Sequence, residues 1–205
     1  MSAGHLRAQQ VSANIRLALG CVALLGLGAC ASGATTGAMT VPLSPDQIIA
    51  DNSSVKGAIA IGTVSGGDET NPLWKSEVSN ANFKTALENS FALATLKAKD
   101  KPLYTLNAKL VSLQQPFAGF DMTVTSTVQY ALLPTGKSDP VMNDTVATPY
   151  TAKFGDALVG VERLRLANEG AMRENIKEEM SRILTAAKPG GPLSNTPGQK
   201  VSSAQ

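Results

Sequence analysis

Histidine and cysteine are almost absent from this chain of 205 residues, which holds one histidine, His5, and two cysteines, Cys21 and Cys30. Residues 31–205 therefore contain neither an imidazole nor a thiol. Triad hydrolases need a histidine base, and zinc sites are built mainly from cysteine and histidine. The absences argue against both classes and leave carboxylate-only catalysis as the remaining enzymatic route. We expect no disulfide, metal or cofactor in residues 31–205.

The chain also lacks a large excess of either basic or acidic residues. The whole chain has 18 Lys+Arg against 16 Asp+Glu. The two surplus cations, Arg7 and Arg16, both lie in the first 29 residues, and the remainder is balanced. Proteins that bind nucleic acid usually carry a basic excess, so we expect no nucleic-acid partner.

The start of the chain, in contrast, has a clear pattern. Arg7 and Arg16, with no acidic residue beside them, precede an apolar run from Leu17 to Ala29, and Cys30 follows directly. This order is typical of a secretory signal peptide. The sequence Leu27-Gly28-Ala29-Cys30 resembles the lipobox of bacterial lipoproteins. The resemblance implies cleavage between Ala29 and Cys30 and acylation of Cys30.

A transmembrane helix is the alternative for this run. The run has 13 residues, whereas a helix that spans a bilayer needs about 20, so we favour the signal peptide. Ala31 follows the cysteine. In the enteric lipoproteins that this start resembles, an aspartate at that position retains the protein in the inner membrane. We therefore expect the periplasmic face of the outer membrane.

Composition then divides the chain into four parts. Residues 1–29 are the predicted signal peptide, and 30–54, rich in Ser, Thr, Gly, Ala and Pro, are predicted to be a lipid anchor and flexible tether. Residues 55–188 are predicted to form a single domain. Residues 189–205 are predicted to be a disordered tail.

Side-chain periodicity predicts six elements in that domain. We expect strands at 56–64, 104–110, 122–132 and 141–154, and helices at 79–99 and 161–187. The strand from Met122 is the clearest, because apolar residues and threonines alternate along it. The order β-α-β-β-β-α, with one face of the sheet exposed to solvent, predicts an α+β two-layer sandwich. Its four-stranded sheet would be mainly antiparallel, with two helices on one face.

The connection from Ser65 to Val78 is longer than most links between a strand and a helix. It contains the sole tryptophan, Trp74, and the adjacent acids Asp68 and Glu69. Tryptophan is enriched at interface hot spots, so Trp74 is a candidate partner contact; packing against its own domain is equally compatible. Adjacent carboxylates diverge, so we interpret Asp68 and Glu69 as exposed loop acids with a minor role in partner binding, not as an acid–base pair.

Arg163 and Arg165 lie near the start of the last helix. Residue spacing predicts surface ion pairs of Glu162 with Arg165 and of Glu169 with Arg173. We interpret the two arginines mainly as such partners. Contact with an anionic lipid or a protein partner is the alternative.

The lipobox, the tether, the order of elements and the long charged final helix together resemble the small lipoprotein subunit of the outer-membrane lipopolysaccharide translocon, over residues 55–187. The stretches 69–74 (ETNPLW) and 162–170 (ERLRLANEG) are similar to those of uncharacterised proteobacterial lipoproteins. The first resemblance implies a plug and assembly partner inside a large β-barrel, and it transfers no functional residue.

These observations favour a non-enzymatic outer-membrane lipoprotein that acts as a binding and assembly partner in envelope biogenesis. Its partners would be the membrane, through Cys30, and an envelope protein, with a β-barrel as one candidate. A scaffold or activator of a periplasmic peptidoglycan enzyme is the alternative, and a carboxylate-only hydrolase is a third.

Overall fold

The computed structural model describes residues 33–45, 49, 53–67 and 77–194. The predicted lipidation site at Ala29 and Cys30 lies outside the described residues, as do Asp68, Glu69 and Trp74. The roles predicted for those five residues therefore stay predictions.

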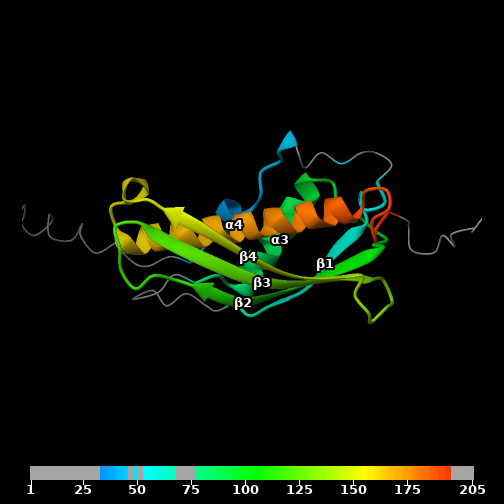
Figure 1. The fold of residues 1–205 in the computed structure, drawn as a ribbon, viewed down its shortest axis with the longest axis horizontal. Coiled ribbons are helices and arrows are strands. Elements are labelled where there is room, and N and C mark those ends of the chain that lie inside the picture. Colours follow the sequence, from blue (N-terminus) through cyan, green and yellow to red (C-terminus); the bar gives the residue numbers. More distant parts are fainter. Residues whose placement is uncertain (1–32, 46–48, 50–52, 68–76, 195–205) are drawn as a thin grey trace, which may run out of the picture. The chain divides into compact units, whose positions relative to one another are not determined.

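Four strands form one sheet in the order β1-β2-β3-β4: β1 (Ile59–Ser65), β2 (Tyr104–Gln114), β3 (Met122–Pro134) and β4 (Met142–Ala152) (Figure 1). β1 pairs with β2 in parallel, whereas β2–β3 and β3–β4 are antiparallel. Parallel neighbours need a crossover, which α3 (Asn80–Leu93) provides. The predicted α+β class, with four strands and mainly antiparallel pairing, is confirmed.

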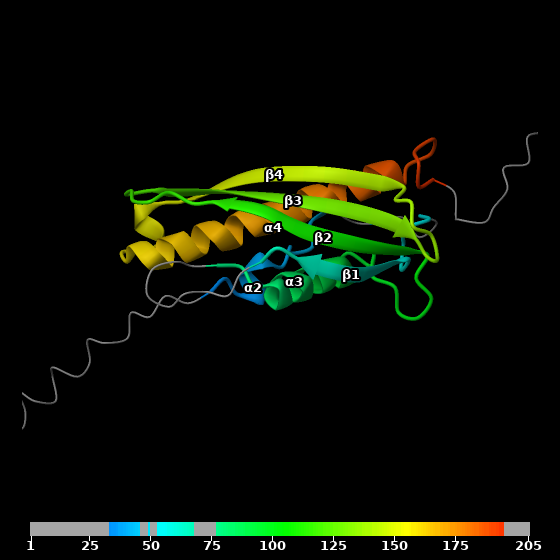
Figure 2. The ribbon, with the colours of Figure 1, turned by 90° about the horizontal axis from the view of Figure 1, so that it is seen from below.

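Two helices cover one face of the sheet (Figure 2). α4 (Gly160–Ala186) contacts β3 and β4, and α3 contacts β1. Ser79 caps α3 as predicted, because its side chain accepts a hydrogen bond of 3.2 Å from the Asn82 N–H. Gly170 lies within the continuous helix α4 for a packing reason, since a Cβ there would lie 2.2 Å from the Tyr150 ring of β4.

The alternation predicted for β3 is confirmed. Its inner face is buried against the helices through Met122, Val124, Ser126, Val128, Tyr130 and Leu132. Thr123 and Gln129, on the other face, are exposed. β4 lies at the edge of the sheet, where Pro149, which has no N–H to donate, is tolerated.

Three predicted boundaries are clearly wrong, and one of them is the end of the second strand, at Gln114 and not at residue 110. The first strand begins at Ile59, not at residue 56, and α3 ends at Leu93, not at residue 99. α3 ends early because Thr95 adopts a positive φ of 55° and the chain turns back, so that the N–H of Leu96 donates to Phe91 O (2.8 Å). This turn buries Leu96 in the core.

The segment after the predicted lipobox is not a flexible tether in its described part. Residues 36–39 form a short helix, α2 (Thr36–Met39), and Ala34, Met39 and Val41 are buried in the core. α2 contacts both α3 and α4. The small and polar composition of the segment suggested flexibility, but Ala34 and Met39 fill space between the two helices.

The beginning of the predicted disordered tail also packs on the domain. Leu193 is buried, and its N–H donates to Ala186 O (2.9 Å). Pro189-Gly190-Gly191-Pro192 ends α4, as predicted, but the turn then returns Leu193 to the core.

Candidate functional site

Glu169 of α4 fixes the segment after the lipobox to the domain. Its Oε1 accepts hydrogen bonds from Thr35 N (2.8 Å), Thr35 Oγ1 (2.9 Å) and Arg165 Nη1 (2.7 Å). The side chain is 2% exposed. A carboxylate this buried needs such partners to offset its lost hydration. Glu169 therefore holds Thr35 against α4.

Both main helices bind the backbone of this segment, residues 34–41, which we call the seated segment. Asn82 of α3 donates to Ala34 O (3.0 Å), and Arg173 of α4 donates to Ala38 O (2.8 Å). The peptide groups are thus satisfied within the domain, as buried backbone groups must be. The seated segment is part of the fold.

The ion pairs of α4 differ in part from the prediction. The Glu162–Arg165 pair forms, but Glu169 pairs with Arg165 and not with Arg173. The guanidinium of Arg173 lies 5.5 Å from the centre of the Tyr150 ring. Hydrogen bonding between Arg165 and Glu162 lowers the pKa of Glu162 and raises that of Arg165. Arg165 thus forms the ion pair with Glu162 that the sequence predicts, and Glu169 is its second partner.

Arg163 is buried, which contradicts its predicted surface position. Its Nη1 donates to Ala157 O (2.5 Å) and Leu158 O (3.0 Å), and Nη2 donates to Gly119 O (3.4 Å). Its guanidinium carbon lies 5.0 Å from the centre of the Phe154 ring, within the range of a cation–π contact. Arg163 therefore joins the β2–β3 loop to the β4–α4 connection.

These two loops present a set of exposed apolar side chains, here called the apolar end: Phe117, Phe120, Phe154, Leu158 and Val159. Phe117 is fully exposed, at 107%. The rings of Phe120 and Phe154 meet edge to face with centroids 5.8 Å apart, and Asp121 accepts from the Phe154 N–H (2.9 Å). Contiguous exposed apolar groups commonly mark interaction sites.

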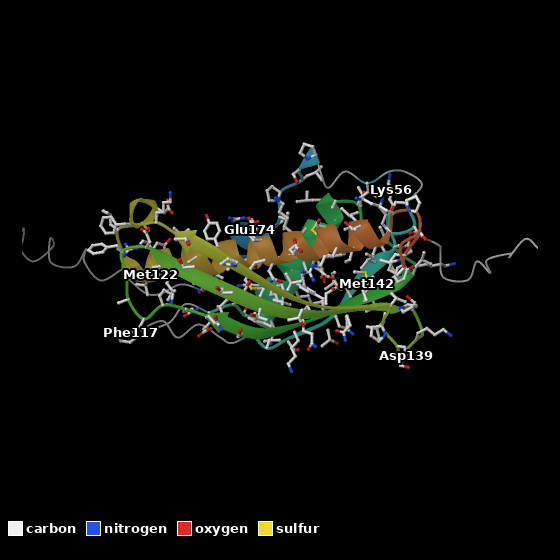
Figure 3. All side chains as sticks on the ribbon, viewed as in Figure 1. Lys56, Phe117, Met122, Asp139, Met142 and Glu174 are labelled. Atoms are coloured by element: carbon white, nitrogen blue, oxygen red, sulfur yellow. The ribbon has the colours of Figure 1, made fainter. Side chains whose placement is uncertain are left out.

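The other end of the sheet has a different chemistry. Figure 3 shows Phe117 and Met122 at one end of the sheet and Asp139 and Met142 at the other. Beyond β1, a cavity of about 930 Å³ is lined in part by Lys56, Lys97, Lys99 and Lys101. Lys97 is paired with Glu88 at 3.0 Å. This basic end is the polar counterpart of the apolar end.

The face of the sheet away from the helices, here called the open face, is polar and almost uncharged. In β2, β3 and β4 it carries mainly hydroxyl and amide groups, and Lys109 is the one charged side chain on this face of these described strands. Its polar uncharged residues are Thr105, Asn107, Ser112, Gln114, Thr123, Thr125, Thr127, Gln129, Asn143, Thr145 and Thr151. A surface of this composition is suited to hydrogen bonding.

Glu179 is a buried acid that sequence reasoning missed. It is 1% exposed, and neither carboxylate oxygen has a hydrogen-bond partner among the described residues. Burial raises the pKa of Glu179 to about 8, with a smaller contribution from Asp144. Within the described residues, no group of three His, Cys, Asp or Glu side chains could hold a metal ion. No helix in the described part of the chain is long and apolar enough to cross a bilayer.

Comparison with known proteins identifies the fold only. No family model and no curated protein match the chain. A DUF330 protein from Xanthomonas campestris has a similar structure, with a TM-score of 0.52 and 12% identity over 75% of this chain and 94% of that one. A candidate lipoprotein from Caulobacter crescentus (TM-score 0.46, 13% identity, 66% and 96% covered) and a hypothetical protein from Chlamydia trachomatis (0.43, 9%, 68% and 99%) are more distant. The first likeness shows the fold alone, and the other two add nothing to it.

Proposed function

We propose that this chain is a non-enzymatic lipoprotein of the outer membrane, acylated at Cys30, whose domain lies close to the membrane and binds an envelope partner. The seated segment carries this proposal. Three residues separate Cys30 from Ala34, and four extended steps of the chain span at most about 14 Å. Ala34 is already buried in the domain. An anchor at Cys30 would therefore keep the domain at the bilayer surface.

A non-enzymatic role is supported by what the buried polar groups of α4 do. Asn175 donates to Val146 O (2.9 Å) and accepts from the Tyr130 hydroxyl (3.0 Å). These bonds join the helix to the sheet. Glu179, which has the raised pKa that catalytic acids often have, is enclosed between helix and sheet and is out of reach of a substrate.

The open face is the surface we propose for the partner. Hydroxyl and amide groups spread over three strands can exchange hydrogen bonds with a second protein at a lower desolvation cost than charged groups, because the face carries almost no charge. We propose an envelope protein as this partner. A β-barrel is the first candidate, on the basis of the sequence resemblance to the lipopolysaccharide translocon subunit.

Acylation is tested with two serine variants. Wild type and Cys21→Ser should both incorporate a palmitate analogue in cells and fractionate with the outer membrane. Cys30→Ser should accumulate as a precursor or as an unlabelled periplasmic protein. A Cys30→Ser protein that is still processed and labelled would contradict the proposal.

The partner surface is tested with two arginine variants. Thr127→Arg places a charge at the centre of the open face, and Asn89→Arg is a matched control on the exposed side of α3. After crosslinking in cells, Thr127→Arg should recover the partner at least about tenfold less well than wild type, a loss of about 1.4 kcal/mol. Asn89→Arg should recover the partner as well as wild type does. Melting temperature is the folding control. A β-barrel in the recovered material supports the first candidate, and a peptidoglycan synthase supports the alternative. Equal recovery by both variants would exclude the open face.

A further inference from the structure

The apolar end and the seated segment lie near each other along α4. Val159 directly precedes the helix, and Thr35 is fixed to Glu169, nine residues after Gly160. At 1.5 Å per residue this separation is about 14 Å along the helix axis. Cys30 is four steps from Ala34 and therefore at most about 14 Å from it. The acylated residue and the apolar end can thus reach one membrane plane.

Polar and charged groups of the two loops are hydrogen-bonded within the loops and fix their shape. The guanidinium of Arg163 is turned inward, onto the carbonyls of Ala157 and Leu158. Asp121 and Asp156 accept backbone N–H groups from Phe154 (2.9 Å) and Lys153 (2.7 Å). The polar groups therefore fix the shape of the two loops and leave their apolar side chains outward.

From this geometry we propose that the apolar end inserts into the same membrane leaflet that receives the acyl chains of Cys30. The occupant of this surface is lipid, because the covalent anchor holds the domain within reach of the leaflet. Aromatic and aliphatic side chains at such a position bury their surface at the headgroup–acyl boundary, which supplies a second attachment signal beside the lipid. The inference rests on the proposed acylation. It also orients the domain, with the β3–β4 hairpin directed away from the leaflet.

The test places a fluorescent probe at each end of the sheet. Residues 31–205 contain no cysteine and the Cys30 sulfur carries the lipid in the proposal, so an introduced thiol is unique in the mature protein. Phe117→Cys and, as a matched control, Asp139→Cys are labelled with an environment-sensitive dye. Both positions are exposed. The lipidated proteins are reconstituted in phosphatidylethanolamine and phosphatidylglycerol vesicles and separated by flotation.

We expect both proteins to float. The probe at residue 117 should show blue-shifted emission and at least about threefold less quenching by aqueous iodide than the probe at 139. Adding Leu158→Ser to the Phe117→Cys protein should reduce this protection while flotation is retained. A probe at Leu158→Cys should be protected as well. Equal quenching at 117 and 139 in floating vesicles would overturn the inference.

Three further outcomes have defined meanings. A protein that does not float contradicts the proposed acylation, and the inference of insertion is then overturned as well. A protein that floats but has equally exposed probes contradicts the insertion alone. Protection that disappears in high salt would mean an electrostatic contact, such as one through the basic end, and would overturn insertion. Protection that disappears on dilution with empty vesicles would mean that a second copy of the chain covers the apolar end, and would overturn it as well.

Discussion

Glu169 and Glu179 are the same residue on the same helix, ten positions apart, and their side chains are buried to almost the same degree. Glu169 Oε1 accepts three hydrogen bonds, two of them from Thr35. Glu179 has no hydrogen-bond partner among the described residues, and burial raises its pKa to about 8. The difference lies in the hydrogen-bond donors that surround each carboxylate. Burial of an acid costs free energy, and only its hydrogen-bond and charge partners can offset that cost.

Glu169 therefore has a structural role, whereas Glu179 lowers the stability of the fold in a way that depends on pH. Around Glu169 the polar groups connect the seated segment to α4, next to the predicted lipid anchor. Around Glu179 the nearby charges are Asp144, Glu178 and Arg182, and two of these three are acids. Substitution of the two glutamates should therefore change stability in opposite directions.

The largest effect is expected for Glu169→Ala. The substitution leaves Thr35 and Arg165 without their acceptor and releases Ala34 and Met39 from the core. We expect the free energy of unfolding to fall by about 4 kcal/mol. Urea denaturation measures the change, with Glu178→Ala as the matched control. Glu178 is an exposed member of a helix ion pair, and its loss should cost about 0.5 kcal/mol or less. A Glu169→Ala protein as stable as Glu178→Ala would mean that the seated segment is not held by this carboxylate.

Glu179→Gln should instead stabilise the protein. Because the folded pKa of about 8 lies above the usual 4.5, the folded state keeps a proton that the unfolded state releases. Wild-type stability should therefore fall as pH rises from about 4.5 to about 8 and then level off. Removal of the acid should flatten this part of the profile and add roughly 3 kcal/mol at pH 8.

Melting curves across that pH range check this prediction, with Glu174→Gln as a control on the same helix. The control should keep the wild-type slope. Parallel profiles for wild type and Glu179→Gln would show that Glu179 is not protonated in the folded protein.

The smallest effect is expected for Arg165→Lys. Lysine keeps the charge beside Glu169 but lacks the rigid planar fork with which the guanidinium bonds both Glu162 and Glu169. The Arg165 side chain is 17% exposed, so water compensates for part of the loss. We expect a decrease of about 1 kcal/mol in urea denaturation. A decrease as large as that of Glu169→Ala would shift the main role from the carboxylate to the arginine.

Local sequence signals were enough to predict most of the sheet and the helix cap. Ser79 has the residue type of an N-cap, and the alternation from Met122 to Leu132 defines both a strand and its buried face. Strand register and the parallel crossover through α3 depend on contacts between distant segments, which local signals do not specify.

The sequence does not predict the packing of the seated segment or the burial of charged side chains, and the reason is physical. Thr35 and Glu169 are 134 positions apart, and nothing in the local composition around Thr35 indicates that Ala34 and Met39 fill space between the helices. A charged side chain normally indicates exposure, but Arg163 and Glu169 are both buried. A signal did exist for Glu179, because it follows Met172 and Ile176 at helical spacing, on the buried stripe of α4. Trp74, Asp68 and Glu69 lie outside the described residues, and their roles remain predictions.

Amide hydrogen exchange of residues 34–41 tests the central claim, that the segment after the lipid anchor belongs to the fold and keeps the domain at the membrane. The mature lipidated protein in vesicles is compared with Glu169→Ala and Glu179→Gln. The account predicts slow exchange at Thr35 and Val41 in wild type, because their N–H groups donate to Glu169 and to Ser90. Exchange there should become fast in Glu169→Ala and stay slow in Glu179→Gln. Fast exchange at both positions in the wild-type protein would contradict the account and restore a flexible tether.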